Sequence, residues 1–213
     1  MDNLFCKEVK QNKAEEILKA LKIDEEVLAI YPYGSRVYGT ASETSDHDYI
    51  IVTKGAFLKS GAFKQNAISS DDRSIQGVLY SRSGFIDALN NYEIGAMECL
   101  FLDPSDVILA KWPFKLQKWD EKEMVSKIIQ KASASWHIGS QQSKDGFKAI
   151  AKKGIFHALR ILMFGVQLKE HKKIINFGEA NELKKEFDRL PEDMFDDRMY
   201  LSLRDELMNK LKA

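Results

Sequence analysis

This sequence of 213 residues has few cysteines and no long apolar run, and each shortage excludes a class of protein. Its two cysteines, Cys6 and Cys99, lie far apart without metal-ligand spacing, so we expect reduced thiols rather than a disulfide framework or a zinc site. No apolar run approaches the roughly 20 residues that a membrane span needs. The first residues also lack the basic and apolar order of a signal peptide. We therefore expect a cytoplasmic globular protein that does not enter a membrane.

The formal net charge is zero, but the charges are unevenly distributed along the chain. Residues 1–110 contain 11 Lys and Arg against 17 Asp and Glu, whereas residues 111–213 contain 21 against 15. The first part therefore carries a net charge of minus 6 and the second a net charge of plus 6. An acidic lobe facing a basic lobe would suit a substrate rich in phosphate, although both excesses can equally lie on solvated helix faces.

Hydrophobic patterning predicts two domains with a boundary at Pro113, namely residues 1–112 with strands and helices and residues 113–213 with helices alone. In the first domain we expect strands over 27–31, 49–53, 75–80 and 107–110, and helices over 7–21, 83–90 and 94–101. In the second domain we expect helices over 121–136, 146–168, 178–190 and 198–212. The glycine-rich and serine-rich residues 54–73 are interpreted as an irregular or mobile connection.

The most informative segment joins a Gly34-Ser35 turn, which follows the first strand, to Asp46 and Asp48 at the start of the second. Because successive strand side chains alternate between faces, Asp46 and Asp48 are expected on one face, about 7 Å apart. Two carboxylates at this spacing can hold a hard cation such as Mg²⁺, which prefers oxygen ligands and retains waters and substrate phosphates. His47 alternates to the opposite face and is interpreted as a structural residue.

A simpler interpretation of the same residues needs no chemistry. Gly34 can be a turn glycine, Ser35 the N-cap of a short helix that ends at Tyr38, and the two aspartates a solvated entry to a strand. Turn and cap requirements do not call for paired carboxylates, so the complete pattern favours a functional site.

The pattern of Gly34-Ser35, ten intervening residues and Asp46-x-Asp48 resembles the nucleotidyltransferase superfamily of DNA polymerase β. The resemblance implies an α+β fold in which a small mixed sheet with flanking helices precedes a C-terminal helical, substrate-binding domain. It implies that Asp46 and Asp48 are catalytic and hold two Mg²⁺ or Mn²⁺ ions. It also implies that Gly34 and Ser35 bind the β- and γ-phosphates of a nucleoside triphosphate such as ATP. Arg36 fits a further phosphate contact, with a surface salt bridge as the alternative.

Active members of this superfamily usually place a third acid on the next strand, where it completes the metal site. The register that we expect puts Gln76 at this position, and an amide carries no charge and cannot serve as a base. Asp71 or Asp72 could take the role if the strand begins earlier, and Glu98 could approach from the following helix. The departure weakens the inference of catalysis more than that of nucleotide binding.

A second informative segment lies in the predicted helix over 146–168, where Lys153, His157 and Arg160 share one stripe. The segment resembles a Lys-x-x-x-His-x-x-Arg helix in a phage and bacterial branch of the same superfamily, some members of which are associated with RNA ligases. The resemblance implies nucleotide or phosphate contacts by these residues. An exposed basic stripe with a packed histidine is the alternative.

The sequence leaves three functions open. The first is transfer of a nucleoside monophosphate from a nucleoside triphosphate to a hydroxyl of an RNA or tRNA end, a protein or a small molecule. The second is a nucleotide-binding or RNA-processing partner without transferase activity. The third is a nucleic-acid-binding protein, although the basic part lacks the interleaved aromatics of a stacking platform.

Overall fold

The computed structural model describes residues 2–55 and 65–213 and divides the chain into two compact units. One unit comprises Met1–Asn91 with Gly95–Lys118, and the other comprises Tyr92–Ile94 with Trp119–Ala213. In chain order the elements are α1 (Asp2–Ala20), β1 (Val27–Tyr33), α2 (Ser35–Tyr38), β2 (His47–Thr53), β3 (Gln65–Ser69), β4 (Ile75–Ser81), α3 (Arg82–Asn90), α4 (Ile94–Phe101), β5 (Leu109–Ala110), α5 (Glu121–Lys144), α6 (Lys148–His171), α7 (Asn181–Arg189), the 3-10 helix η1 (Asp197–Tyr200) and α8 (Leu201–Lys212).

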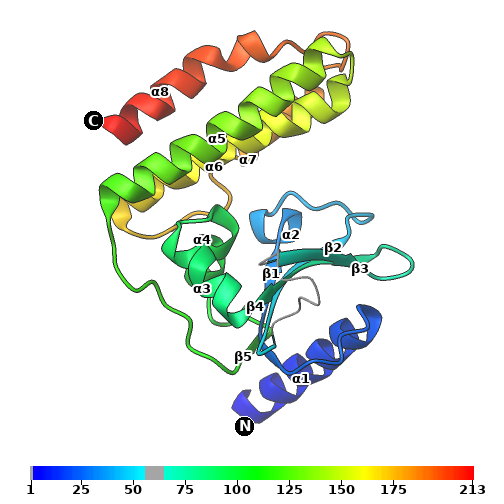
Figure 1. Cartoon of the computed structure of the whole chain (residues 1–213). Helices are drawn as coiled ribbons and strands as arrows, with labels where there is room; N and C mark the ends of the chain where they lie inside the picture. Colours follow the sequence, from blue (N-terminus) through cyan, green and yellow to red (C-terminus); the bar gives the residue numbers. More distant parts are fainter. Residues whose placement is uncertain (1, 56–64) are drawn as a thin grey trace. The chain divides into compact units, whose positions relative to one another are not determined.

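The first unit is built on a mixed sheet in the order β3-β4-β2-β1-β5 (Figure 1). Strand β2 pairs parallel with β4, and the pairs β1–β2, β1–β5 and β3–β4 are antiparallel. Together with the helices, this sheet confirms the predicted α+β class. The parallel pair matters most for the site, because it brings the start of β4 beside the start of β2.

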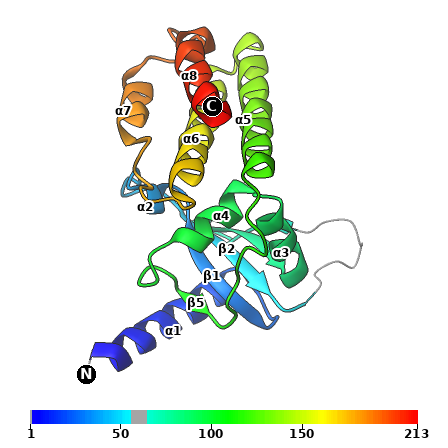
Figure 2. The ribbon, with the colours of Figure 1, turned by 90° about the vertical axis from the view of Figure 1, so that its left-hand side faces the viewer.

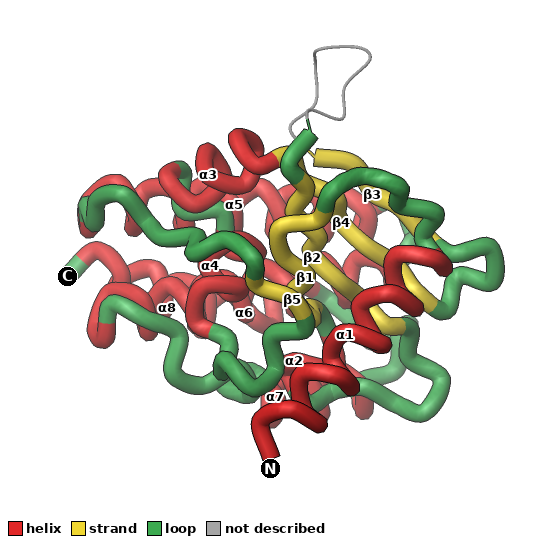
Figure 3. The backbone as a smooth tube through the Cα atoms, turned by 90° about the horizontal axis from the view of Figure 1, so that it is seen from below, coloured by secondary structure: helices red, strands yellow, loops and turns green. Residues whose placement is uncertain are grey.

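Helices cover both faces of the sheet. On one face α1 contributes Ala14, Ile17 and Leu21 to a core that includes Ile51 and Leu79, and Figure 3 shows α1 lying across the strands. A fully buried large apolar side chain contributes about 1.5–3 kcal/mol relative to an exposed one. This core therefore determines which face of β2 packs against α1.

Helix α3 covers the opposite face of the sheet. Its Phe85 is fully buried, with ring centroids 5.9 Å from Tyr31 of β1 and 5.5 Å from Tyr80 of β4. Strand alternation puts the side chain of Asp48 on this face, at the end of the sheet. The carboxylate of Asp48 therefore lies on the face with α3, at the end of the sheet.

The second unit is helical, and its longest helices, α5 and α6, run side by side with α8 packed against them (Figure 2). The two long helices approach closely at a pair of glycines, because a Cβ added to Gly154 would lie only 3.3 Å from the Cα of Gly139. No helix in the described part of the chain has both the length and the apolar character needed to cross a membrane.

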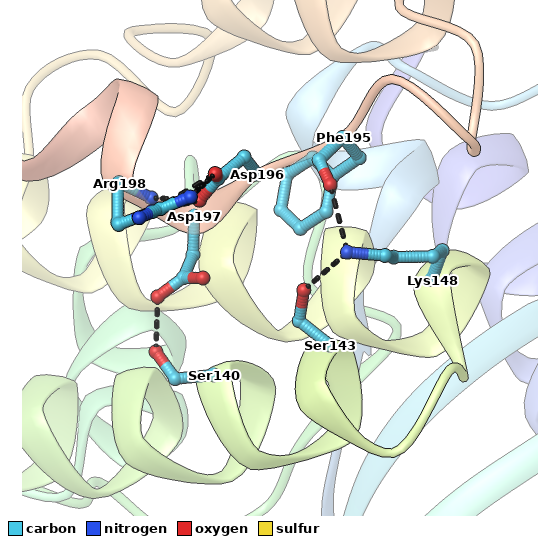
Figure 4. A network of polar contacts seen from close by, with 7 residues as sticks. All are labelled: Ser140, Ser143, Lys148, Phe195, Asp196, Asp197 and Arg198. Carbon is cyan, nitrogen blue, oxygen red and sulfur yellow. Dashed lines mark hydrogen bonds and ion pairs between the residues drawn. The ribbon is translucent and has the colours of Figure 1, made fainter.

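A polar network in this unit ties the segment before α8 to α5 and α6 (Figure 4). Lys148 of α6 donates from Nζ to Ser143 Oγ at 2.9 Å and to the Phe195 carbonyl at 3.0 Å. Ser140 of α5 donates to Asp197 Oδ2 at 2.5 Å. The bonds from Lys148 to Phe195 and from Ser140 to Asp197 join residues 47 and 57 positions apart, and so hold the segment before α8 against α5 and α6.

Residues 54–73 were predicted to be irregular, yet 65–69 form β3; the rest of this connection includes 56–64, which lie outside the described residues. Ser35 was offered as an N-cap, but Gly34 occupies that position without a side-chain capping bond. Cys99 is a free, buried thiol as expected, and the side chain of Cys6 lies outside the described residues.

Candidate functional site

The turn after β1 is a position that only glycine can occupy. Gly34 has φ 77° and ψ −151°, a backbone region that is essentially restricted to glycine. A Cβ added here would overlap the Asp48 carboxylate, at 3.1 Å from its Cγ and closer still to Oδ2. The backbone of the turn therefore lies directly against a carboxylate that is 14 residues away in sequence. This contact joins the two halves of the sequence motif in space.

The second half of the motif consists of Asp46 and Asp48. Asp48 pairs with Tyr33 across β1 and β2, and Asp46 precedes the first residue of β2. Burial raises the pKa of Asp48, the neighbouring charge of Asp46 raises it further, and Arg36 lowers it. A divalent cation would relieve both unfavourable effects, because it supplies positive charge and oxygen coordination to a carboxylate that is poorly solvated.

Gln76 occupies the position that a third acid would take. The parallel register pairs it with Asp48, which confirms the register expected from the sequence. Its Nε2 donates a hydrogen bond to Asp46 Oδ2. An ionised carboxylate only accepts hydrogen bonds, so the amide nitrogen must face Asp46. The sequence indicated the place of Gln76 but gave no signal for this bond.

The other acids considered for the third position have different partners. Asp71 forms an exposed ion pair with Lys22 at 2.8 Å. Asp72 accepts hydrogen bonds from Ser70 and Ser74, which lower the pKa of its carboxyl to about 2. Among residues 2–55 and 65–213, no three His, Cys, Asp or Glu side chains gather into a possible metal-binding group.

Glu98 supports the turn instead of completing the carboxylate set. It is 3% exposed and accepts a hydrogen bond of 2.7 Å from the Tyr38 hydroxyl at the end of α2. Tyr38 in turn stacks edge to face with Tyr33, the residue before Gly34. The pair anchors both ends of the segment that contains Gly34 and Ser35. Sequence reasoning missed this role, because the two partners lie 60 residues apart.

Arg36 holds the loop that leads into β2. Its Nε donates to the Asp46 carbonyl at 3.1 Å, and its Nη2 donates to the Ser45 carbonyl at 2.5 Å. Both bonds go to backbone carbonyls of the loop between α2 and β2. A guanidinium has five N–H donors, so these two bonds are compatible with a phosphate contact by the others.

His47 lies on the other face of β2, as strand alternation predicted. Its ring stacks on Tyr49 with the planes 9° apart. Burial lowers the pKa of His47, Arg36 and Lys13 lower it further, and Asp46 and Glu16 oppose them. Its contacts with this face support the structural interpretation.

The basic stripe of α6 belongs to the second unit. Arg160 and His157 are joined by a hydrogen bond of 2.9 Å between Nη2 and Nδ1. Arginine can only donate, so Nδ1 is the acceptor and the imidazole is neutral with its proton on Nε2. Burial and the charges of Arg160 and Lys131 lower the pKa of His157 to about 4. Lys153 is exposed on the same helix.

Comparison with known proteins identifies the family. The nucleotidyltransferase domain family matches residues 14–131, which is more than half of the chain. The chain belongs to this family. Its matched region contains Gly34, Ser35, Asp46, Asp48 and Gln76. The expected superfamily is thereby confirmed, and membership implies a nucleotide substrate and a transferase of the general nucleotidyl type.

No curated protein matches the chain. A solved nucleotidyltransferase-like protein from Exiguobacterium sibiricum is 15% identical, with 96% of this chain and 73% of that chain covered and a TM-score of 0.35.

The residues of the site fit the divalent metals that nucleotidyltransferases generally use. Asp46 and Asp48 supply anionic oxygen, and Gln76 adds a neutral amide beside them. Hard cations such as Mg²⁺ and Mn²⁺ prefer carboxylate oxygens of this kind.

Proposed function

We propose that this nucleotidyltransferase is metal-dependent and transfers a nucleoside monophosphate from a nucleoside triphosphate, such as ATP, to a hydroxyl acceptor. The observation that carries the proposal is the contact between the Gly34 backbone and the Asp48 carboxylate. It brings the turn for which we propose phosphate binding beside the carboxylate for which we propose cation binding, as a metal–triphosphate complex requires. An RNA or tRNA end, a protein and a small molecule are the candidate acceptors.

In the proposed reaction the acceptor oxygen forms a bond to the α-phosphorus, and the bond from that phosphorus to the bridging oxygen of the β-phosphate breaks. Pyrophosphate leaves, and the acceptor proton passes to water. A bound Mg²⁺ or Mn²⁺ ion would lower the pKa of the hydroxyl and neutralise charge on the phosphates. Asp46 and Asp48 hold the metal, while Gly34 and Ser35 hold the leaving phosphates through backbone and hydroxyl hydrogen bonds.

The proposal extends to the second unit and to the domain boundary. We assign residues 1–112 to a catalytic domain and residues 113–213 to a helical domain that binds substrate. Within the latter, Lys153, His157 and Arg160 are proposed to contact nucleotide phosphates. The neutral His157 would donate from Nε2, because Arg160 occupies Nδ1. A cytoplasmic location, where nucleotides and RNA are available, is part of the same proposal.

A labelling experiment tests the transfer. The protein is incubated with α-labelled nucleoside triphosphates, Mg²⁺ or Mn²⁺, and total RNA or total protein. We expect label to appear in an acceptor. Asp46→Asn and Asp48→Asn should each lower the rate of transfer by about a hundredfold or more, because each variant loses a proposed metal ligand. Asp71→Asn is a matched control, since Asp71 pairs with Lys22 on the surface. Transfer that survives both site substitutions would refute the proposal.

One observation favours a second function, that of a nucleotide-binding or RNA-processing partner without transferase activity. Gln76 provides no charge and no base where active members usually have an acid. This function predicts metal-dependent nucleotide binding that Asp46→Asn abolishes, without label transfer to any acceptor. Equilibrium binding measured beside the labelling experiment separates the two functions.

A further inference from the structure

The neutral residue at the third position has a consequence for the number of metal ions. Asp46, directly before β2, and Asp48, in β2, provide two carboxylates, and Gln76 pairs with Asp48 from β4 without adding a third. The other acids considered for this position have partners elsewhere: Asp71 is in an ion pair with Lys22, Asp72 accepts hydrogen bonds from Ser70 and Ser74, and Glu98 accepts one from the Tyr38 hydroxyl. Two divalent cations would bring four positive charges to two carboxylates. The two carboxylates would therefore balance the charge of one divalent cation, and a second cation would depend on phosphate oxygens alone.

The hydrogen bond of Gln76 acts on Asp46 directly. The Nε2 proton occupies one lone-pair direction of Asp46 Oδ2 and fixes the orientation of the carboxylate. If Asp46 Oδ2 also bound a second cation, that cation would have to share the oxygen with the amide proton of Gln76. Hydrogen bonds of this kind orient metal ligands, and their loss typically weakens metal affinity 10- to 100-fold.

We infer that the site binds a single divalent cation with each nucleoside triphosphate, and that Gln76 is a positioning residue that orients Asp46 in place of a third metal-binding carboxylate. The inference rests on the proposed metal–nucleotide site and specifies its stoichiometry. It follows that a carboxylate introduced at position 76 creates a site for a second ion.

Counting Mn²⁺ ions by electron paramagnetic resonance tests the inference without any need for turnover. Wild-type protein is titrated with Mn²⁺ in the presence of a saturating α,β-methylene nucleoside triphosphate. The adenosine, guanosine, cytidine and uridine analogues are used in turn. The same titration is made with Gln76→Glu and with Gln76→Asp, so that one acid of suitable length is available if the other destabilises the fold. Gln11→Glu is the charge-matched control, because Gln11 is exposed on α1 of the same unit. Melting curves by circular dichroism establish that each variant is folded.

We expect one Mn²⁺ per bound analogue for wild type and for Gln11→Glu, and two for at least one of the acidic variants. Gln76→Met, which keeps the length but loses the donor, should still bind one ion with about tenfold weaker affinity. Two ions on wild type, one ion on both folded acidic variants, or unchanged affinity in Gln76→Met would each overturn the inference. Absence of analogue-dependent Mn²⁺ binding by wild type would instead overturn the proposed function and, with it, the inference.

Discussion

Replacing Gly34 by alanine tests whether the turn and the carboxylate depend on each other. The backbone at φ 77° and ψ −151° costs an L-residue about 1–3 kcal/mol. In addition, the new Cβ would stand 3.1 Å from Asp48 Cγ and 3.2 Å from its Cβ, with Oδ2 closer still. The carboxylate must therefore move, and overpacking of this kind adds about 1–3 kcal/mol. We expect Gly34→Ala to lower the free energy of unfolding by about 2–6 kcal/mol in total.

Another glycine in the chain separates the two contributions. Gly146, between α5 and α6, also has a positive φ of 87°, but a Cβ added there has no neighbouring atom within 4 Å. Gly146→Ala should therefore have only the backbone strain, about 1 kcal/mol or slightly more. Urea denaturation followed by circular dichroism gives both free energies. Metal-dependent binding of α,β-methylene ATP should be lost in Gly34→Ala and retained in Gly146→Ala.

A double-mutant cycle identifies the carboxylate as the cause. Asp48→Ala removes Oδ2 and Cγ, so Gly34→Ala should be less destabilising in that background by about 1 kcal/mol or more. The same cycle with Gly146→Ala should be additive within about 0.5 kcal/mol. Equal destabilisation by both glycine substitutions, together with additivity in both cycles, would refute the contact between the turn and Asp48 as the basis of the site.

Three further outcomes are expected. Burial and nearby cations lower the pKa of His157 from 6.5 to about 4, so the unfolded chain binds more protons between these values and stability should fall by up to about 3 kcal/mol as the pH is lowered from 6.5 to 4. Urea denaturation across this range should show a flatter pH dependence for His157→Gln, and an equally steep dependence would refute the assignment. Burial and the charge of Asp46 raise the pKa of Asp48, so the folded protein loses stability as the pH rises from the usual aspartate range through the raised pKa. Asp48→Asn should therefore raise the melting temperature of the metal-free protein at pH 7, and an unchanged or lower melting temperature would contradict this expectation. Lys148→Met should lower the free energy of unfolding of the helical unit by about 1–3 kcal/mol through loss of two hydrogen bonds, and calorimetry that shows no change would argue against the network of Figure 4.

The helices and the inner strands were predictable because their apolar residues repeat at regular intervals. The predicted helix over 94–101 coincides with α4, and the predicted strands over 27–31, 49–53 and 75–80 all lie within β1, β2 and β4. Strand β3 was missed for a physical reason. It is the edge strand of the sheet formed by the described residues and pairs there with β4, and Ile68 is its one large apolar residue. Little of this strand is buried, so little of its formation is recorded as hydrophobic pattern.

Local rules were sufficient to determine part of the site from the sequence. The alternation of a strand gave Asp46 and Asp48 a common face and sent His47 to the other, because the side-chain period of a strand is two residues. A Gly-Ser pair after an apolar strand indicated a turn with a special backbone conformation, which Gly34 has. These inferences involve residues close together in the chain.

Tertiary structure decided the contacts that join distant segments. The parallel pairing of β2 with β4 brought the Gln76 amide onto Asp46, and the packing of α4 gave Glu98 to Tyr38 rather than to the carboxylate pair. Both depend on which segments meet in the folded chain, and a residue's own neighbours in sequence carry no record of that choice. The sequence thus determined that two carboxylates and a glycine turn are present and that Gln76 stands in the next strand, and the fold decided that the Gln76 amide binds Asp46 and that Glu98 binds Tyr38.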